Sequence, residues 1–274
     1  MKKINSIVAA ATLAVATHAA SAGDSIKLYT LDCGAVDVAD MAPFDDKGRF
    51  DGQSTVLANP CFLIRHPKGD LLWDTGMEQS LADIPEGIGD NFHFTAKRKL
   101  TDQLADLGLG VADIDFLSIS HWHPDHSGNA GLFAASTWIV NRTERAFMFA
   151  EEKPQGSEDY IALEDAKTIQ FDATHDVFGD GSAVITSLPG HTPGHSILTL
   201  KLDKAGTLMF SGDLHIFAEG RKVDAIPTFN FDAEATVPSL RRFAEMAKKE
   251  NARVIIQHEK ADFDALPKFP KYLD

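Results

Sequence analysis

The stretch His121-Trp122-His123-Pro124-Asp125-His126 decides how this chain is interpreted. It places three imidazoles and one carboxylate within six positions, directly after the apolar residues 114–120, whose pattern predicts a buried strand. A zinc ion takes about four nitrogen, sulfur or oxygen ligands. Four ligand side chains in one loop are crowded for a single ion, so the stretch predicts a site for two metal ions where a strand ends.

Three later positions repeat this arrangement of an apolar run followed by a ligand. His191 follows the expected strand 183–188, Asp213 follows 207–211, and His258 follows 252–257. Any one of them alone would be read as an ordinary structural residue. Together with the first stretch they complete a set of seven candidate ligands: His121, His123, Asp125, His126, His191, Asp213 and His258. Two metal ions that share a carboxylate and a hydroxide need about this many ligands, and Asp125 among them could carry a proton to a leaving group.

Strands and helices alternate along most of the chain. Its 274 residues, 44% of them hydrophobic, suffice for a sizeable core. Further strands are expected at 25–32, 61–65, 71–74, 138–140 and 196–202, and helices at 97–108, 143–152 and 238–249. This alternation predicts an α/β or α+β class with layered sheets, and the simplest organisation is one mature domain over residues 23–274.

The first 22 residues have the composition of a secretory signal. Lys2 and Lys3 precede an apolar stretch over 7–17, which is too short to span a bilayer well, and Ala20-Ser21-Ala22 follows. We expect cleavage before Gly23 and a periplasmic or secreted protein without a membrane segment. The formal charge of −14 repels phosphate backbones, which argues against a nucleic-acid partner. A small-molecule substrate is expected instead.

The only two cysteines are Cys33 and Cys61. An exported protein meets an oxidising compartment, where a disulfide between them can form. The sequence does not decide between that bond and two buried thiols.

The ligand pattern resembles the metallo-β-lactamase superfamily. Its H-x-H-x-D-H motif is present from His121 to His126, and the later ligands follow in the family's order. The resemblance implies a four-layer αβ/βα sandwich, with His121, His123 and His191 on one metal, and with Asp125, His126 and His258 on the other. It also implies that Asp213 bridges the two and that Asp74, in Asp74-Thr75-Gly76, orients a ligand imidazole. The ions are expected to be zinc, although the same ligands accept Mn, Fe or Co.

Within this superfamily the chain is most similar to the N-acyl homoserine lactonases. In having a bridging carboxylate at Asp213, the chain resembles glyoxalase II, these lactonases and methyl parathion hydrolase. The segments 28–34 and 226–229 look most like the lactonase branch. One departure stands out, because lactonases of this branch carry a Tyr three residues after the bridging Asp and this chain has Ile216 there. Isoleucine cannot donate a hydrogen bond, and His215 is a candidate substitute.

The resemblance implies an exported dinuclear hydrolase that opens lactone rings, in which a metal-bridging hydroxide attacks and Asp125 and Asp213 are the catalytic carboxylates. Organophosphate, aryl ester or thioester hydrolysis on the same site is the alternative, while a di-iron redox protein is disfavoured because the hydrolase ligands are kept. Members of the branch often dimerise, so a homodimer is compatible with the resemblance. The expected substrate contacts are His215, Ile216, Phe149 and Phe229, and other apolar candidates are Met41, Phe44, Phe92, Phe94, Phe147 and Phe217. His66, His93 and His175 lack the strand-end context and receive no role.

Overall fold

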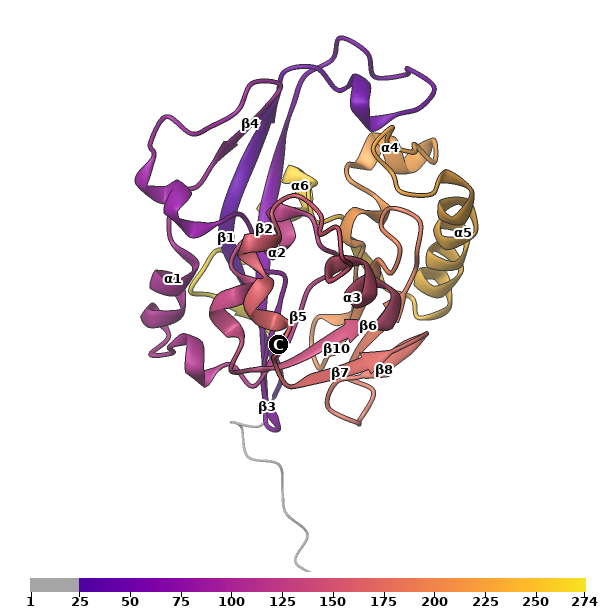
Figure 1. Ribbon diagram of the computed structural model, residues 1–274. Helices are drawn as coiled ribbons and strands as arrows, with labels where there is room; N and C mark the ends of the chain where they lie inside the picture. Colours follow the sequence, from indigo (N-terminus) through magenta and orange to yellow (C-terminus); the bar gives the residue numbers. More distant parts are fainter. Residues whose placement is uncertain (1–24) are drawn as a thin grey trace, which may run out of the picture.

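The computed structural model describes residues 25–274, so the expected signal segment 1–22 and its cleavage site lie outside the described residues. Two β-sheets face each other and carry helices on their outer faces (Figure 1). The strands are β1 (Lys27–Val38), β2 (Thr55–His66), β3 (Gly69–Trp73), β4 (Phe92–Thr95), β5 (Phe116–Ser118), β6 (Thr137–Asn141), β7 (Thr168–Phe171), β8 (Thr174–Asp176), β9 (Ala183–Ser187), β10 (Ser196–Leu202), β11 (Gly206–Phe210), β12 (Arg253–Ile255) and β13 (Tyr272–Leu273).

The helices lie between and after these strands. The α-helices are α1 (Leu100–Asp106), α2 (Pro124–Ser127), α3 (Arg142–Met148), α4 (Ala218–Lys222), α5 (Ala233–Lys249) and α6 (Lys260–Ala265). Short 3-10 helices cover Ala42–Phe44, Gln79–Asp83, Val111–Asp113, Ala130–Phe133, Ser157–Asp159, Ile161–Leu163 and Gly212–Leu214. Within residues 25–274, none of the helices is long and apolar enough to cross a membrane.

The first sheet has the strand order β13-β1-β2-β3-β5-β6-β7, with β4 paired to β1. It is antiparallel from β13 to β3 and parallel from β3 through β5 and β6 to β7. The second sheet has the order β12-β11-β10-β9-β8, in which only β11 and β12 are parallel. Parallel neighbours end at the same edge of a sheet, so β3 and β5 deliver the residues that follow them to one place.

Three layers of buried apolar side chains hold the four layers of the sandwich together. Between the sheets, side chains such as Phe62 and Phe210 meet with ring centroids 4.5 Å apart. Leu100 and Leu104 of α1 pack on the outer face of the first sheet, whereas Leu240 and Phe243 of α5 pack on the outer face of the second. In Figure 1, α1 and α5 accordingly lie on opposite sides of the molecule. The expected αβ/βα fold class is confirmed.

Element boundaries differ from the sequence-based expectation in informative ways. The first strand continues to Val38 because a bulge between Asp32 and Ala35 carries it past Gly34. Helix α5 begins five residues before Pro238, capped by the Asp232 carboxylate, which accepts from the N–H of Ala235. Short strands such as β7 and β8 were not expected, because runs this brief have too little periodicity to be recognised.

Cys33 on β1 and Cys61 on β2 form a disulfide, with a Cα–Cα distance of 5.8 Å. The sequence left this bond open. It closes a span of 28 residues and joins the two strands that carry the longest antiparallel ladder of the first sheet.

Candidate metal centre

All seven candidate ligands converge at one edge of the sandwich. His121 and His123 follow β5, and the single turn of α2 supplies Asp125 and His126. From the second sheet, the loops after β9, β11 and β12 supply the other three ligands: His191, Asp213 and His258. Their ligand atoms form two groups, His121 with His123, His191 and Asp213, and Asp125 with His126 and His258, each within 4.8 Å.

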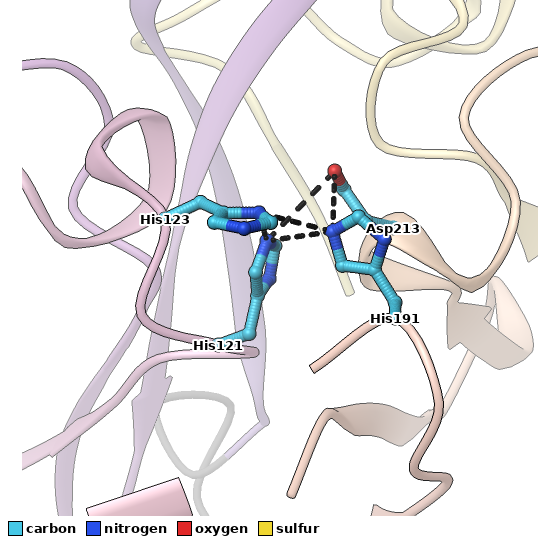
Figure 2. A group of neighbouring side chains, drawn as sticks. All are labelled: His121, His123, His191 and Asp213. Carbon is cyan, nitrogen blue, oxygen red and sulfur yellow. Dashed lines mark hydrogen bonds and ion pairs between the residues drawn. The ribbon is translucent and has the colours of Figure 1, made fainter. Parts of the chain in front are cut away.

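In the first group, three ring nitrogens form a triangle (Figure 2). His121 Nε2 lies 2.8 Å from His123 Nδ1, and His191 Nε2 lies 3.2 and 3.0 Å from these two atoms. Asp213 Oδ2 lies 3.4 Å from His191 Nε2 and 3.8 Å from His121 Nε2. This carboxylate oxygen is the fourth candidate ligand atom of the first group.

The second group faces the other oxygen of the same carboxylate. Asp213 Oδ1 lies 2.9 Å from His258 Nε2 and 3.0 Å from His126 Nε2, which are 3.1 Å from each other. Asp125 Oδ2 stands 3.5 Å from His258 Nε2 and 3.7 Å from His126 Nε2. Asp213 therefore lies between two sets of nitrogens, as a bridging ligand would.

The ring nitrogens that point away from the centre fix the tautomers of the histidines. Three of them donate an N–H to an oxygen, namely His126 to Asp74 Oδ2 at 3.0 Å, His191 to Asn230 Oδ1 at 2.9 Å and His258 to the Ala58 carbonyl at 2.8 Å. A neutral imidazole carries only one proton, so the inward nitrogen of each ring presents a lone pair.

The residues fit two divalent cations. Inward lone pairs about 3 Å apart repel one another, and buried Asp213 Oδ1 has no hydrogen-bond donor among the described residues. A cation between them converts this repulsion into attraction. Ligand atoms placed tetrahedrally at roughly 2.0–2.1 Å from a zinc ion lie about 3.3 Å apart, close to the observed nitrogen separations.

The electrostatics keep His121 neutral and Asp213 ionised, whereas the carboxylates draw onto His126 a proton that a bound cation would displace. Complete burial lowers the pKa of His121 well below its usual value, which keeps this ring neutral. Burial also disfavours the charged form of His126, but the carboxylates of Asp213, Asp125 and Asp74 outweigh it and raise the pKa of His126 well above its usual value. Burial alone would raise the pKa of Asp213, yet the neighbouring His258 and His126 lower it far below its usual value. Asp213 therefore stays ionised and available to a cation.

Asp74 supports the ligand loop from the end of β3. Its backbone has a positive φ of 57°, a conformation in which L-residues are uncommon. The carboxylate accepts from the N–H of Ser120 at 2.5 Å and from Gln257 Nε2 at 2.7 Å, in addition to His126. The structure thus places Asp74 against a ligand imidazole, the position that the family resemblance implied.

Glu144 holds the two ligand loops together, and no motif or periodicity in the sequence pointed to this role. This residue of α3 is buried, and its carboxylate accepts from the N–H of Trp122 at 2.9 Å. The other oxygen accepts from Thr192 Oγ1 at 2.9 Å and from the N–H of Gly194 at 2.8 Å. One side chain therefore joins the loop of His121 to the loop that follows His191. Burial raises its pKa to about 7, against the effect of these three hydrogen bonds.

His195 holds the backbone of Asp213 from behind, a contact that sequence reasoning missed. It donates from Nδ1 to the Leu188 carbonyl at 3.2 Å and accepts at Nε2 from the N–H of Asp213 at 3.0 Å. A Cβ at Gly212 would stand 2.5 Å from His195 Nε2, so this contact requires glycine at position 212.

A cavity of about 300 Å³ opens onto the ligands. Four ligands form its floor, and eight apolar residues form its walls: Val36, Phe44, Leu57, Phe92, Phe94, Pro124, Ile216 and Phe229. Two of the four residues expected to contact substrate, Ile216 and Phe229, line this cavity. Phe229 stands at the rim, with 41% of its surface exposed.

The other two expected contacts lie elsewhere. The ring of His215 packs against Phe243 of α5, 5.4 Å between centroids, and does not line this cavity. Phe149 packs edge-on against Trp138 and Tyr160 in the apolar layer under the first sheet. Neither side chain lines the cavity above the ligands, because each packs against other residues on its own side of the sheets.

The comparison with protein families agrees with this geometry. The model of the metallo-beta-lactamase superfamily matches residues 54–258. The chain belongs to this superfamily. It is 30% identical over 261 residues to N-acyl homoserine lactonase AttM of Rhizobium radiobacter, covering 89% of this chain and 98% of the relative. It is 28% identical over 263 residues to AttM of Azorhizobium caulinodans, covering 91% and 99%.

A solved structure shares the fold. An N-acyl homoserine lactone hydrolase with the product N-hexanoyl-L-homoserine at its catalytic metal center superposes with a TM-score of 0.77 at 24% identity, covering 91% of this chain and all of that one. Membership of the superfamily and the converging ligands identify the protein as a metal-dependent hydrolase that acts on ester bonds.

Proposed function

We propose that this protein hydrolyses N-acyl homoserine lactones to N-acyl homoserines at a site for two divalent metal ions. Both ions are proposed to be zinc. The observation that carries the dinuclear proposal is Asp213, whose two oxygens face two separate groups of nitrogens. The names of the relatives support the lactone as substrate. Two ions bound here would lower the pKa of a water between them and polarise the substrate carbonyl.

The protein side chains have separable roles in this proposal. Asp213 spans the two groups of nitrogens, and Asp125 lines the cavity with 21% of its side chain exposed. Asp125 is therefore placed to deliver a proton to the alkoxide that leaves when the ring opens. Ile216 and Phe229 form part of the wall that excludes water from the ring.

A pH-stat assay tests the function. The zinc-loaded protein should consume one equivalent of base per N-hexanoyl homoserine lactone, a chelator should abolish this reaction, and added zinc should restore it. His123→Ala should lose nearly all activity, while His175→Ala, on β8 outside the ligand groups, serves as the matched control. Hydrolysis that survives complete metal removal would contradict the proposal, as would no hydrolysis by protein with two metals bound.

We further propose that the protein is exported. The composition of residues 1–22 supports a cleaved signal, and the Cys33–Cys61 disulfide supports folding in an oxidising compartment. Fractionation of expressing cells tests this proposal. Mature protein that begins at Gly23 outside the cytoplasm is expected, and full-length protein confined to the cytoplasm would contradict it.

A further inference from the structure

A second cavity, of about 440 Å³, opens beside β1 and is larger than the cavity above the metal ligands. We call it the β1 cavity. It is lined by residues of β1 and β2, by residues between 95 and 103, and by residues between 260 and 269. Of the described residues, only Leu57 lines both cavities, and none of the seven candidate ligands lines the β1 cavity. The metal centre therefore does not account for it.

The β1 cavity lies where the edge of the first sheet is interrupted. On the side of β1 away from β2, β13 pairs with Leu28 and Tyr29, and β4 pairs with residues 35–38. Neither β13 nor β4 pairs with residues 30–34, which include the bulge. The side chain of Gln103 takes the place of a strand there, because it accepts from the N–H of Asp32 at 2.9 Å and donates to the Asp32 carbonyl at 2.8 Å. The gap in the sheet edge is thus only partly filled by α1.

Apolar side chains form much of the lining. They come from β1 and β2 and from α6 and the residues after it: Ala35, Val56, Leu57, Ala58, Phe263, Pro267 and Phe269. Cavities of about 300–1,000 Å³ with a mostly apolar lining and a few polar groups are typical of small-molecule sites. The volume and the lining therefore suit the apolar part of a small molecule.

The charged lining residues are mainly cationic. They comprise four cations and two carboxylates: Lys97, Arg98, Lys260, Lys268, Asp32 and Asp264. Arg98 also pairs with Asp106, outside the lining, at 2.7 Å. Because the whole chain has a formal charge of −14, this concentration of positive charge is a local feature. Positive charge that lines a cleft raises the local concentration of anions.

The carboxylates leave part of this positive charge unpaired. Asp264 is shared by Lys260 and Lys268. Lys268 Nζ also lies 3.8 Å from the centroid of the Phe263 ring, which holds this ammonium group against the apolar lining. Lys97 is exposed and forms no ion pair among residues 25–274. An anionic group at the mouth of the cavity would find cations that the protein itself does not neutralise.

We propose that the β1 cavity is a second ligand site, which binds a medium-chain alkyl carboxylate. The alkyl chain lies on the apolar lining, and the carboxylate pairs with Lys97 and Lys268, which are both exposed. A neutral amphiphile would leave these cations unpaired, and a cationic one would be repelled by them. This inference is independent of the reaction at the metal centre.

Calorimetric titration of the zinc-loaded protein tests the ligand class. Affinity should rise by about fourfold for each methylene added from butanoate through hexanoate to octanoate, because each one is buried. Octan-1-ol has the chain of octanoate without its charge and should bind about 2–30-fold more weakly, the effect of two exposed ion pairs. Octyltrimethylammonium should bind more weakly than octan-1-ol. Octan-1-ol that binds as tightly as octanoate would overturn the assignment of an anion.

Variants locate the ligand, since a carboxylate can also bind zinc in the other cavity. Ala35→Leu fills part of the β1 cavity and should abolish the charge-dependent binding of octanoate. Phe229→Ala, at the rim of the cavity above the metal ligands, should leave this binding unchanged. The opposite pattern, with binding kept by Ala35→Leu and lost by Phe229→Ala, would overturn the inference.

A charge reversal tests the head-group contact at an exposed position where the fold is not at risk. Lys97→Glu should weaken octanoate binding by about 2–30-fold and leave octan-1-ol binding within twofold. Lys249→Glu, at the exposed end of α5, makes the same change in net charge outside the cavity and is the matched control. Equal weakening by both variants would show a general charge effect and would overturn the contact. No binding of millimolar octanoate to the wild-type protein would overturn the site itself.

Discussion

Glu144 offers the sharpest test of how the site is assembled. In the Glu144→Ala variant, the N–H groups of Trp122 and Gly194 and the hydroxyl of Thr192 lose their shared acceptor inside the protein. Each buried donor left unpaired costs about 1–3 kcal/mol, which would sum to roughly 3–9 kcal/mol if nothing replaced the carboxylate.

Two effects reduce this cost. Water admitted to the vacated space can pair some of the donors. The variant also no longer buries a carboxylate whose pKa is raised to about 7 from 4.5, a relief worth roughly 3 kcal/mol above pH 7. We therefore expect the free energy of unfolding to fall by about 2–4 kcal/mol at pH 8. Because the two ligand loops lose their common anchor, zinc affinity should fall by about 10–100-fold.

Urea denaturation of the metal-free protein and zinc competition against a chromophoric chelator measure these two quantities separately. Glu151→Ala, at an exposed position just beyond the same helix, is the matched control and should change neither. A Glu144→Ala variant that loses stability but keeps its zinc affinity within twofold would refute the reasoning, because the carboxylate would then support the fold without holding the ligand loops in register.

Three further predictions concern the wall, the disulfide and a buried histidine. Ile216→Tyr adds a hydroxyl near the metal ligands and should raise kcat for N-hexanoyl homoserine lactone, by at most about 10²-fold; an unchanged kcat in the pH-stat would mean that the missing hydroxyl does not limit the reaction. Replacing Cys33 and Cys61 by serine should lower the free energy of unfolding in urea by about 3–4 kcal/mol, the entropic effect of a cross-link that spans 28 residues, and a loss below about 1 kcal/mol would disagree with it. Burial lowers the pKa of His215 to about 3, so the unfolded chain binds a proton between pH 6.5 and 3 that the folded protein does not. The free energy of unfolding therefore falls with falling pH in this window by about 1.4 kcal/mol per pH unit. The His215→Phe variant should lose this contribution to the pH dependence of stability. An equal pH dependence in both proteins would contradict the lowered pKa of His215.

The candidate ligand set was predictable because each member lies in a short pattern of neighbouring residues. Four ligands lie within six residues, and each remaining ligand follows directly on an apolar strand, so period and motif were sufficient to find His191, Asp213 and His258. The layered α/β class followed from the same alternation of strands and helices, and the sheets confirm it.

Residues whose role depends on long-range contact were not predictable. Glu144 reaches Gly194 across 50 positions, and Asn230 reaches His191 across 39, so nothing in their own neighbourhoods points to the site. His215 adjoins the ligand segment in sequence, yet the backbone after Asp213 turns its ring toward α5. Nearness in sequence was a poor guide there, because neighbouring side chains in an extended segment face opposite ways.

Counting the bound metals tests whether Asp213 joins two metal ions in one site. Elemental analysis of zinc-loaded protein, with native mass spectrometry of the same sample, should give two zinc ions per chain. Asp213→Ala should retain one or none, and Asp203→Ala, at an exposed position on the turn after β10, should retain two. One ion per chain in a fully active wild-type protein, or two ions retained by Asp213→Ala, would contradict the dinuclear site.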